Sequence, residues 1–444
     1  MRRLFFICFG LTAMVAVGSY WWQFPGLGGV DGIAPMAQVF EALSRRNTIF
    51  ELPTLLWFSS SDVMIHALLA LAFFSGVAMV IGLAPRAACV TLWLCWGSLV
   101  QVGQPFLSFQ WDILLIESAF CAAWFAPPGL KPRFDDEPPR AFAFVMYALA
   151  CKVTLQSGIV KLTSGDPSWR DFTALTYHWW TQPLPTWSSF VIAELPRFVQ
   201  KAMCVAMFAF ELVIPLLAFG PRRLRVISAL GLMGLQVALF VAGNYSYYNL
   251  LTFVLALPLL VDGGPRSRWR WALPAAYALI SIGVFTRAPW VNPLRRFDTI
   301  NAYGAFAWMT KNRAEIIVEG SNDGSTWLAY ELPWKPGAVT RRPTFVAPWQ
   351  PRLDWQMWFA SLGQCGNNPW ILSMQQKVLL GEPTVLSLFE TSPFATAPKF
   401  LRTRSFEYRF APLSEKGVWW TRTEVGPYCP ALRLDENGRL MRAD

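Results

Sequence analysis

The chain has 444 residues, of which 54% are hydrophobic and only 15% charged, whereas about a quarter of an average soluble protein is charged. This composition excludes a wholly soluble enzyme, a disordered chain and a nucleic-acid binder, despite a net charge of +10. Charged residues occupy 33 of the first 286 positions and 33 of the remaining 158. Residues 1–286 therefore predict a transmembrane helical bundle, and residues 287–444 an aqueous domain.

About nine segments are candidate membrane helices, each of which needs about 20 mostly apolar residues to cross a bilayer. They are residues 4–22, 63–84, 87–106, 110–126, 141–163, 201–219, 224–242, 247–261 and 271–286. The first also has features of a signal peptide, because Arg2 and Arg3 precede its apolar run. The aromatic residues that follow it favour an uncleaved anchor.

The distribution of basic residues predicts the orientation of these spans. With the N-terminus inside, 12 Lys and Arg fall in short inner segments, including Arg266, Arg268 and Arg270, and five fall in longer outer loops. Because basic residues are retained on the inner side of membranes, loop 164–200 and residues 287–444 share the outer face. That face is the periplasm of a bacterium, for a protein of the inner membrane, or the lumen in a eukaryote, for a protein of the endoplasmic reticulum membrane.

The outer loop 164–200 is rich in polar and aromatic side chains. Asp166 or Ser168 can cap a short helix that begins near Trp169 and ends at Gln182-Pro183. One hypothesis is an interfacial helix without a site. The other is a polar mouth above the bundle, whose candidate binding residues are Asp166, Trp169, Arg170, Asp171, Tyr177, His178 and Gln182.

Few charged side chains fall at membrane depth, where they are costly and usually face the bundle interior. They are Asp112, Glu117, Lys152, Lys161 and Glu211. We expect Lys152 and Glu211 to form a pair, because both lie near mid-bilayer on spans joined by one outer loop. Such charges either hold the helices together or line a proton or substrate path.

The last part of the chain predicts a β-sandwich-like domain with inserted helices. Residues 315–332 have a strand–turn–strand pattern around Asn322-Asp323-Gly324, and residues 400–410 alternate again. Helical segments are expected at 354–362, 370–380 and 383–390. Cys365 and Cys429 are the only cysteines outside apolar segments, and the sequence leaves open whether they are bridged. With no CxxC motif and two histidines, no metal site and no cofactor are predicted.

Several strings in the chain resemble signature motifs of the lipase maturation factor family. They are Gly165-Asp166-Pro167-Ser168-Trp169-Arg170-Asp171, Thr181-Gln182-Pro183-Leu184-Pro185, Phe109-Gln110-Trp111-Asp112, Val318–Gly324, Arg341-Arg342-Pro343, Pro348–Phe359, Trp419-Trp420 and Gly426-Pro427-Tyr428. The resemblance implies a multi-span membrane protein with a lumenal C-terminal domain. In animals the family helps secreted lipases reach their folded, active assembly. Arg352, Asp354 and Trp355 in these motifs join the candidate binding residues.

The function expected from this resemblance is that of a membrane-bound maturation or folding factor, a chaperone for exported clients such as lipases. The alternative is an integral membrane enzyme with a lipid-soluble cofactor, because the membrane region is distantly similar to vitamin K-dependent carboxylases. Lys152, Lys161 or His178 would then be the base. A transporter also fits the spans, but no internal repeat favours one.

Overall fold

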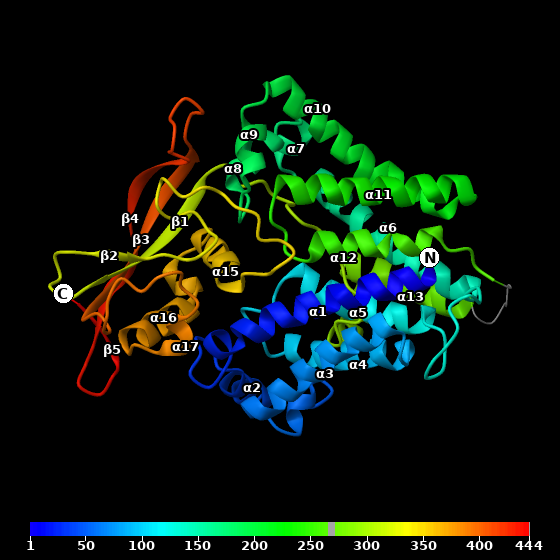
Figure 1. Ribbon diagram of the computed structural model, residues 1–444, viewed down its shortest axis with the longest axis horizontal. Helices are drawn as coiled ribbons and strands as arrows, with labels where there is room; N and C mark the ends of the chain where they lie inside the picture. The colour runs from blue at the N-terminus through cyan, green and yellow to red at the C-terminus, as the bar shows by residue number, and fades with distance from the viewer. Residues whose placement is uncertain (265–270, 444) are drawn as a thin grey trace.

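A computed structural model describes residues 1–264 and 271–443. A helical bundle makes up most of the molecule, and a strand-rich domain lies at one end of it (Figure 1). The N-terminus lies at the opposite end of the bundle. We call the end that carries the C-terminal domain the domain end.

The bundle contains the helices of the first two thirds of the chain. The longer ones are α1 (Arg2–Leu27), α3 (Asp62–Ile81), α4 (Pro85–Val100), α5 (Gln110–Phe125), α6 (Arg140–Thr163), α10 (Arg197–Phe208), α11 (Arg222–Ala242), α12 (Tyr248–Leu255) and α13 (Ala272–Phe285). Shorter elements are α2 (Met36–Ser44), η1 (Leu55–Trp57), α7 (Pro167–Arg170), α8 (Leu175–Thr181), α9 (Trp187–Ala193), η2 (Ala209–Val213), η3 (Ile214–Phe219), η4 (Leu257–Leu260), η6 (Pro289–Val291) and α14 (Asn292–Arg295).

Among the described residues, five helices are long and apolar enough to cross a membrane: α1, α3, α6, the continuous segment Arg197–Phe219, and α11. The number is six if α13 and the segment Pro289–Arg295, bent from it by 114°, count as one broken span. Helices also occupy the other predicted spans. However, α4 and α5 have 16 residues each, or about 24 Å at 1.5 Å per residue, which is short of a bilayer core of about 30 Å. The structure thus shows a polytopic helical membrane protein, and the count of nine stays a prediction.

Two glycines allow α1 and α3 to approach each other closely. A Cβ atom on Gly10 would lie 2.5 Å from the carbonyl oxygen of Gly76, and one on Gly76 would lie 2.8 Å from that of Gly10. The hydrophobic effect does not drive helix association within lipid. Small residues at such crossings instead let the two backbones pack closely, and this packing stabilises the helix pair.

Arginines stabilise helix ends at the end of the bundle opposite the C-terminal domain, which we call the basic end. Each donates hydrogen bonds to carbonyl groups at or just beyond a helix C-terminus: Arg2 to Phe125 (2.6 Å), Arg3 to Met79 (2.9 Å), Arg86 to Ala126 (2.9 Å) and Arg225 to Leu259 (2.7 Å). Cations near helix C-termini also complement the helix dipole. The predicted inner residues Arg266, Arg268 and Arg270 lie outside the described residues.

The C-terminal domain contains one antiparallel sheet in the order β2-β1-β3-β4-β5. Its strands are β1 (Arg313–Ser321), β2 (Leu328–Tyr330), β3 (Phe400–Phe410), β4 (Trp420–Leu434) and β5 (Leu440–Arg442). The expected turn joins β1 to β2, with Gly324 at φ 76°. The described strands form this single sheet rather than the two facing sheets of a sandwich.

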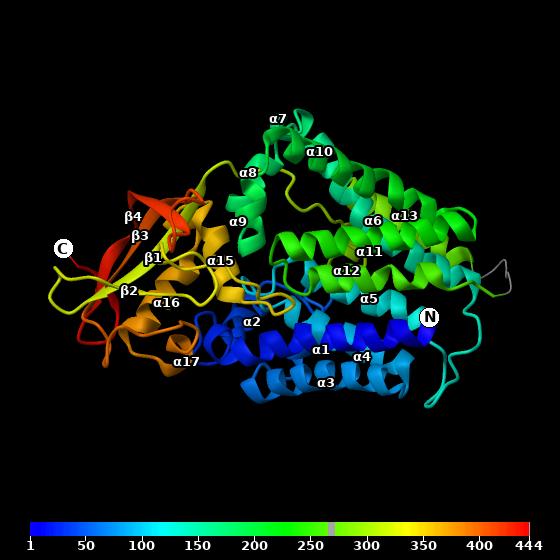
Figure 2. The same ribbon diagram turned by 45° about the horizontal axis from the view of Figure 1, so that its top comes forward.

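Helices, instead of a second sheet, cover the side of this sheet that faces the bundle (Figures 1 and 2). Between β2 and β3 the chain forms α15 (Arg352–Ser361), η7 (Cys365–Asn367), α16 (Pro369–Leu379) and α17 (Pro383–Leu386). α15 packs against β1, and α16 against β3 and β4, while α15 and α17 also contact α1. The same helices therefore connect the sheet to the bundle.

Candidate functional site at the junction of the two domains

A buried ion pair joins the first turn of α15 to the first turn of α5. Arg352 donates from Nη1 to Oδ2 of Asp112 at 2.9 Å and from Nη2 to Oδ1 at 2.8 Å. Both side chains are fully buried. Tyr247 donates to Oδ1 of the same carboxylate at 2.6 Å, and Arg352 also donates to the carbonyl of Phe106 at 2.6 Å. Bidentate geometry with further hydrogen bonds is what a buried pair needs to offset the loss of hydration.

Aromatic rings surround the Arg352 guanidinium. Its central carbon lies 5.0 Å from the ring centre of Tyr20, and 5.8 Å from those of Trp96 and Phe109. Burial acts to lower the pKa of Arg352, but the charge of Asp112 and its hydrogen bonds outweigh that effect and raise it. Arg352 therefore remains a cation, and the C-terminal domain inserts a positive charge into a cage that the bundle provides.

Gln23 of α1 binds the backbone beside this arginine. It donates to the carbonyl of Gln350 at 2.7 Å and accepts from the amide of Arg352 at 2.9 Å. Three helices of the bundle thus contact residues 350–352: α1 through Gln23, α4 through Trp96 and α5 through Asp112. The two domains are held together by directional contacts.

The other two candidates on α15 also stabilise the junction. Asp354 accepts hydrogen bonds from the backbone amides of Trp334 and Lys335, both at 2.8 Å, and burial raises the pKa of its carboxyl to about 6. Trp355 packs edge-on against Trp111 of α5, with ring centres 4.7 Å apart. The exposed large side chains on and just after this helix are Phe359 and Leu362.

Loop 164–200 folds into three short helices before α10 begins at Arg197, and Asp166, one of the two expected caps, caps α7. Asp166 accepts from the amide of Ser168 at 2.8 Å, and it also accepts from the amide of Met309 at 2.7 Å. Trp169 donates its indole N–H to the carbonyl of Phe306 at 3.1 Å. The predicted single helix is broken between α7 and α8, where Phe172 has φ 57°. This part of the loop therefore binds the segment that enters the C-terminal domain.

His178 and Gln182 belong to a buried hydrogen-bonded chain. Tyr245 donates its hydroxyl to Oε1 of Gln182 at 2.8 Å and lies 2.6 Å from Nε2 of His178. Because that hydroxyl proton is used toward Gln182, the N–H of the histidine lies on Nε2. Burial, together with the charge of Lys161, lowers the pKa of His178 to about 3. The imidazole is therefore neutral at physiological pH.

The remaining loop candidates do not join this chain. Arg170 and Asp171 are exposed, and Tyr177 is half-buried, with the Lys311 ammonium 5.8 Å from its ring centre. Asp166, Trp169, His178 and Gln182 are buried and contribute to packing and hydrogen bonding. The structure thus divides the seven predicted residues between the interior of the junction and its surface.

Arg313 is a junction residue that the sequence analysis missed. From β1 it donates to the carbonyls of Trp180 at 2.9 Å, Gln182, and Pro183 at 2.8 Å, and it pairs with Glu315 at 2.7 Å. Lys335 also pairs with this carboxylate, with its Nζ 2.9 Å from Oε2 of Glu315. An arginine alternating with apolar residues in a strand resembles a solvent-facing position, so no local signal indicated its burial.

The intramembrane charges form two pairs, but not the predicted one. Lys152 binds Glu117, which also accepts from the hydroxyls of Tyr277 at 2.7 Å and Tyr303 at 2.6 Å and from the amide of Asn301 at 3.0 Å. Lys161 binds Glu211, with Nζ 2.7 Å and 2.9 Å from its two carboxylate oxygens. The expected pair of Lys152 and Glu211 is therefore wrong.

The reason is helical geometry. Lys152 and Lys161 are nine residues apart on α6, which is two and a half turns at about 3.6 residues per turn, so they face opposite sides. Lys152 faces α5 and α13, whereas Lys161 faces the π-helical turn η2 that carries Glu211. Each ammonium has its own carboxylate, so neither lysine is an isolated base.

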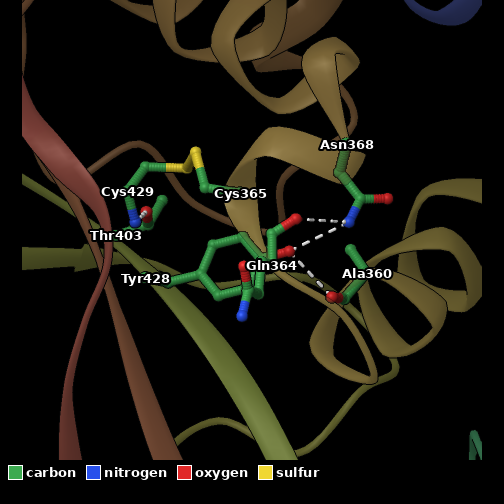
Figure 3. Close-up of a disulfide and its surroundings, with 7 residues drawn as sticks. All are labelled: Ala360, Gln364, Cys365, Asn368, Thr403, Tyr428 and Cys429. Atoms are coloured by element: carbon green, nitrogen blue, oxygen red, sulfur yellow. Dashed lines mark hydrogen bonds between the residues drawn. A yellow bond between two sulfur atoms is a disulfide. The ribbon is translucent and has the colours of Figure 1, made fainter.

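A disulfide joins Cys365 of η7 to Cys429 of β4, with Cα atoms 5.4 Å apart (Figure 3). Beside it, Tyr428 donates to the carbonyl of Ala360 at 2.8 Å and accepts from Asn368 at 3.0 Å. The six other cysteines are free thiols. The bridge therefore fastens the helices that carry the junction residues to the sheet. In the part of the chain that the structure describes, no group of His, Cys, Asp and Glu is arranged to hold a metal ion.

These features define a polytopic integral membrane protein whose C-terminal domain packs onto one end of its helical bundle. Residues 1–265 match the family model of the lipase maturation factor transmembrane domain, and residues 299–430 match that of the lipase maturation factor C-terminal domain. The chain belongs to the lipase maturation factor family.

Curated relatives match nearly the whole chain. Human lipase maturation factor 2 is 29% identical over 98% of this chain and 83% of its own length, and the chicken protein of the same name is 29% identical over 98% and 82%. Mouse lipase maturation factor 1 is 30% identical over 86% of this chain and 77% of its own length. No solved structure matches the chain.

Proposed function

We propose that this protein is a membrane-bound maturation factor that assists the folding or assembly of exported proteins, with lipases as its clients. One observation carries the proposal: both of its domains match the two lipase maturation factor models. The relatives named above bear lipase maturation in their names. The buried junction supports it by making the C-terminal domain a fixed platform beside the membrane.

The client-binding surface that we propose lies on α15 and just beyond it. Arg352, Asp354 and Trp355 are buried and fix this helix, whereas Phe359 and Leu362 remain 46% and 48% exposed. Exposed apolar side chains on a rigid element can cover apolar surface of an incompletely folded client. Arg170 and Asp171, exposed on the loop of the same end, are candidates for polar contacts.

The alternative of a carboxylase-like enzyme lacks a specific supporting observation. Its base candidates Lys152 and Lys161 are ion-paired, and His178 is buried in a hydrogen-bonded chain. We therefore retain the maturation function alone.

The test is a deletion of the gene, complemented by variants, with secreted lipase activity and abundance as readouts. We expect the deletion to lower the active fraction of the lipase. The double variant Phe359→Ser/Leu362→Ser should lower it too, while its own abundance in membranes stays normal. Val425→Ser, which changes a 68% exposed residue of β4, is the matched control and should behave like the wild type. Unchanged lipase activity in the deletion strain would refute the proposal.

We further propose that the domain end faces the periplasm or the lumen, where clients fold. Arg133→Cys, Arg170→Cys and Pro430→Cys place thiols at exposed positions. An impermeant thiol reagent is applied to intact cells or sealed vesicles of known orientation. Positions 170 and 430 should react from the same side of the membrane, and position 133 only from the other side. Labelling of all three from one side would show that the topology is incorrect.

A further inference from the structure

A groove of about 530 Å³ opens on the side of the bundle at its basic end. Ala84, Arg86, Ala87 and Val90 at the start of α4 line it, together with Pro128 and Leu130 of the loop after α5. Val90 is 38% exposed and Leu130 66% exposed. Because the lining is mostly apolar and the exposed Leu94 lies one turn beyond Val90 on α4, we expect the groove to open toward lipid.

One rim of the groove is cationic. The exposed Arg86 uses Nη2 to donate to the carbonyl of Ala126 at 2.9 Å, which leaves other guanidinium N–H groups available. The groove also lies at the N-terminus of α4, where Ala84 provides no side-chain cap. The first amides of a helix lack intrahelical acceptors and favour an anion. Because Pro85 has no N–H and the Ala88 amide donates to the Ala84 carbonyl at 2.9 Å, the amides concerned here are those of Arg86 and Ala87. An apolar wall thus adjoins a site suited to a phosphate.

Neighbouring charges agree with this polarity. Arg3 binds the last carbonyls of α3 next to Gly82, and Lys131 follows Leu130 as an exposed side chain. The acidic residues of this loop, Asp135 and Asp136, follow Phe134, and Arg2 donates to the backbone carbonyl of Asp136 at 2.9 Å. Basic residues are also enriched where membrane proteins meet anionic headgroups.

We propose that this groove binds an anionic phospholipid, with the phosphate on Arg86 and one acyl chain along Ala87 and Val90. The lipid links the α3–α4 connection to the loop after α5, which already meet through the hydrogen bond from the Ala84 amide to the Leu130 carbonyl at 2.7 Å. A ligand that binds only the folded protein stabilises it, so bound lipid raises the unfolding temperature.

The purified, delipidated full-length protein in detergent tests this directly. Its unfolding temperature is measured with added phosphatidylglycerol, phosphatidylcholine or inorganic phosphate, and retained lipid is counted by mass spectrometry after mild extraction. Phosphatidylglycerol should give the largest upward shift. Arg86→Gln should weaken its binding about tenfold, as expected for the loss of a charge-assisted contact, and Arg86→Lys should restore part of it. Ala87→Trp should block the acyl chain without changing the charge.

Arg223→Gln is the matched control, because Arg223 is an exposed arginine in the first turn of α11 at the same end of the bundle. It should keep the wild-type response to phosphatidylglycerol. Equal losses in Arg86→Gln and Arg223→Gln would mean that lipid responds only to total charge, and would overturn the proposal. A full response to inorganic phosphate, or to phosphatidylcholine, would overturn it as well. If Ala87→Trp does not fold, the comparison of the Arg86 and Arg223 variants still decides the outcome.

Discussion

Asp112 and Arg352 are 240 residues apart in the chain, yet their side chains form a fully buried bidentate ion pair with N–O distances of 2.8 and 2.9 Å. Asp112 belongs to the bundle and Arg352 to the C-terminal domain. This pair, with its aromatic cage, is one of several contacts that join the two domains, beside those of Gln23 and Arg313.

Removing one member of this pair should destabilise the protein more than removing both. Arg352→Met leaves the Asp112 carboxylate buried without its cation, which costs about 3–5 kcal/mol in comparable cases. Asp112→Asn combined with Arg352→Met should recover part of that loss. The measurement is a double-mutant cycle on thermal unfolding in detergent. Additive losses would show that the two side chains do not interact.

The two pairs on α6 make a sharper test, because each lysine serves as the control for the other. Lys161→Met and Glu211→Gln should be non-additive, with a coupling free energy of roughly 0.5–3 kcal/mol. Lys152→Met and Glu211→Gln should instead add independently. Coupling of Lys152 to Glu211 would restore the pair expected from sequence and contradict the structure.

His178 should make the protein less stable in mild acid. Its pKa is about 3 in the folded protein, against 6.5 ordinarily, so the unfolded chain binds more protons between these pH values. The contribution of the neutral His178 to the free energy of unfolding is fully present well above pH 6.5 and declines as the pH falls toward 3. At 1.36 kcal/mol per pKa unit, the loss at pH 5 is about 2 kcal/mol. Unfolding free energies measured from pH 7.5 to 5 provide the test.

The raised pKa of Asp354 makes the folded protein more stable as the pH falls through about 6, which opposes the effect of His178. The test therefore compares the pH dependence of the unfolding free energy between variants. His178→Gln should remove the contribution of His178 to the pH slope. His66→Gln, which replaces the only other histidine, keeps His178 and therefore that contribution. Identical slopes in His178→Gln and the wild type would refute the assignment.

The Cys365–Cys429 bridge should be present in the protein purified from membranes and should stabilise its C-terminal domain. Thiol trapping of the denatured protein should find six free thiols before reduction and eight after it. The sequence separation of 64 residues predicts about 4 kcal/mol from the loss of unfolded-chain entropy alone. Cys365→Ser/Cys429→Ser should therefore unfold at a lower temperature, whereas Cys204→Ser, at a buried free thiol, leaves the bridge intact. Eight reactive thiols without reductant would disprove the bridge.

The sequence by itself determined the features that depend on neighbouring residues. Apolar runs indicated the membrane helices, alternation predicted β3 over residues 400–410, and Asp166 was one of the two residues expected to cap the first helix of loop 164–200. Cys365 and Cys429 stood out because they alone lie outside apolar segments. Each of these signals depends only on residues close together in the sequence, whose relative positions follow from the local backbone conformation.

Only the tertiary structure decided which distant side chains meet. The direction in which each lysine of α6 points relative to its neighbours selects Glu117 for Lys152 and Glu211 for Lys161. Burial of Arg313, Arg352 and His178 likewise depends on how the C-terminal domain docks on the bundle. A single sequence records the polarity of a residue but not the partner that offsets its lost hydration. That partner is set by helix rotation, crossing geometry and domain contact, which are properties of the packed molecule.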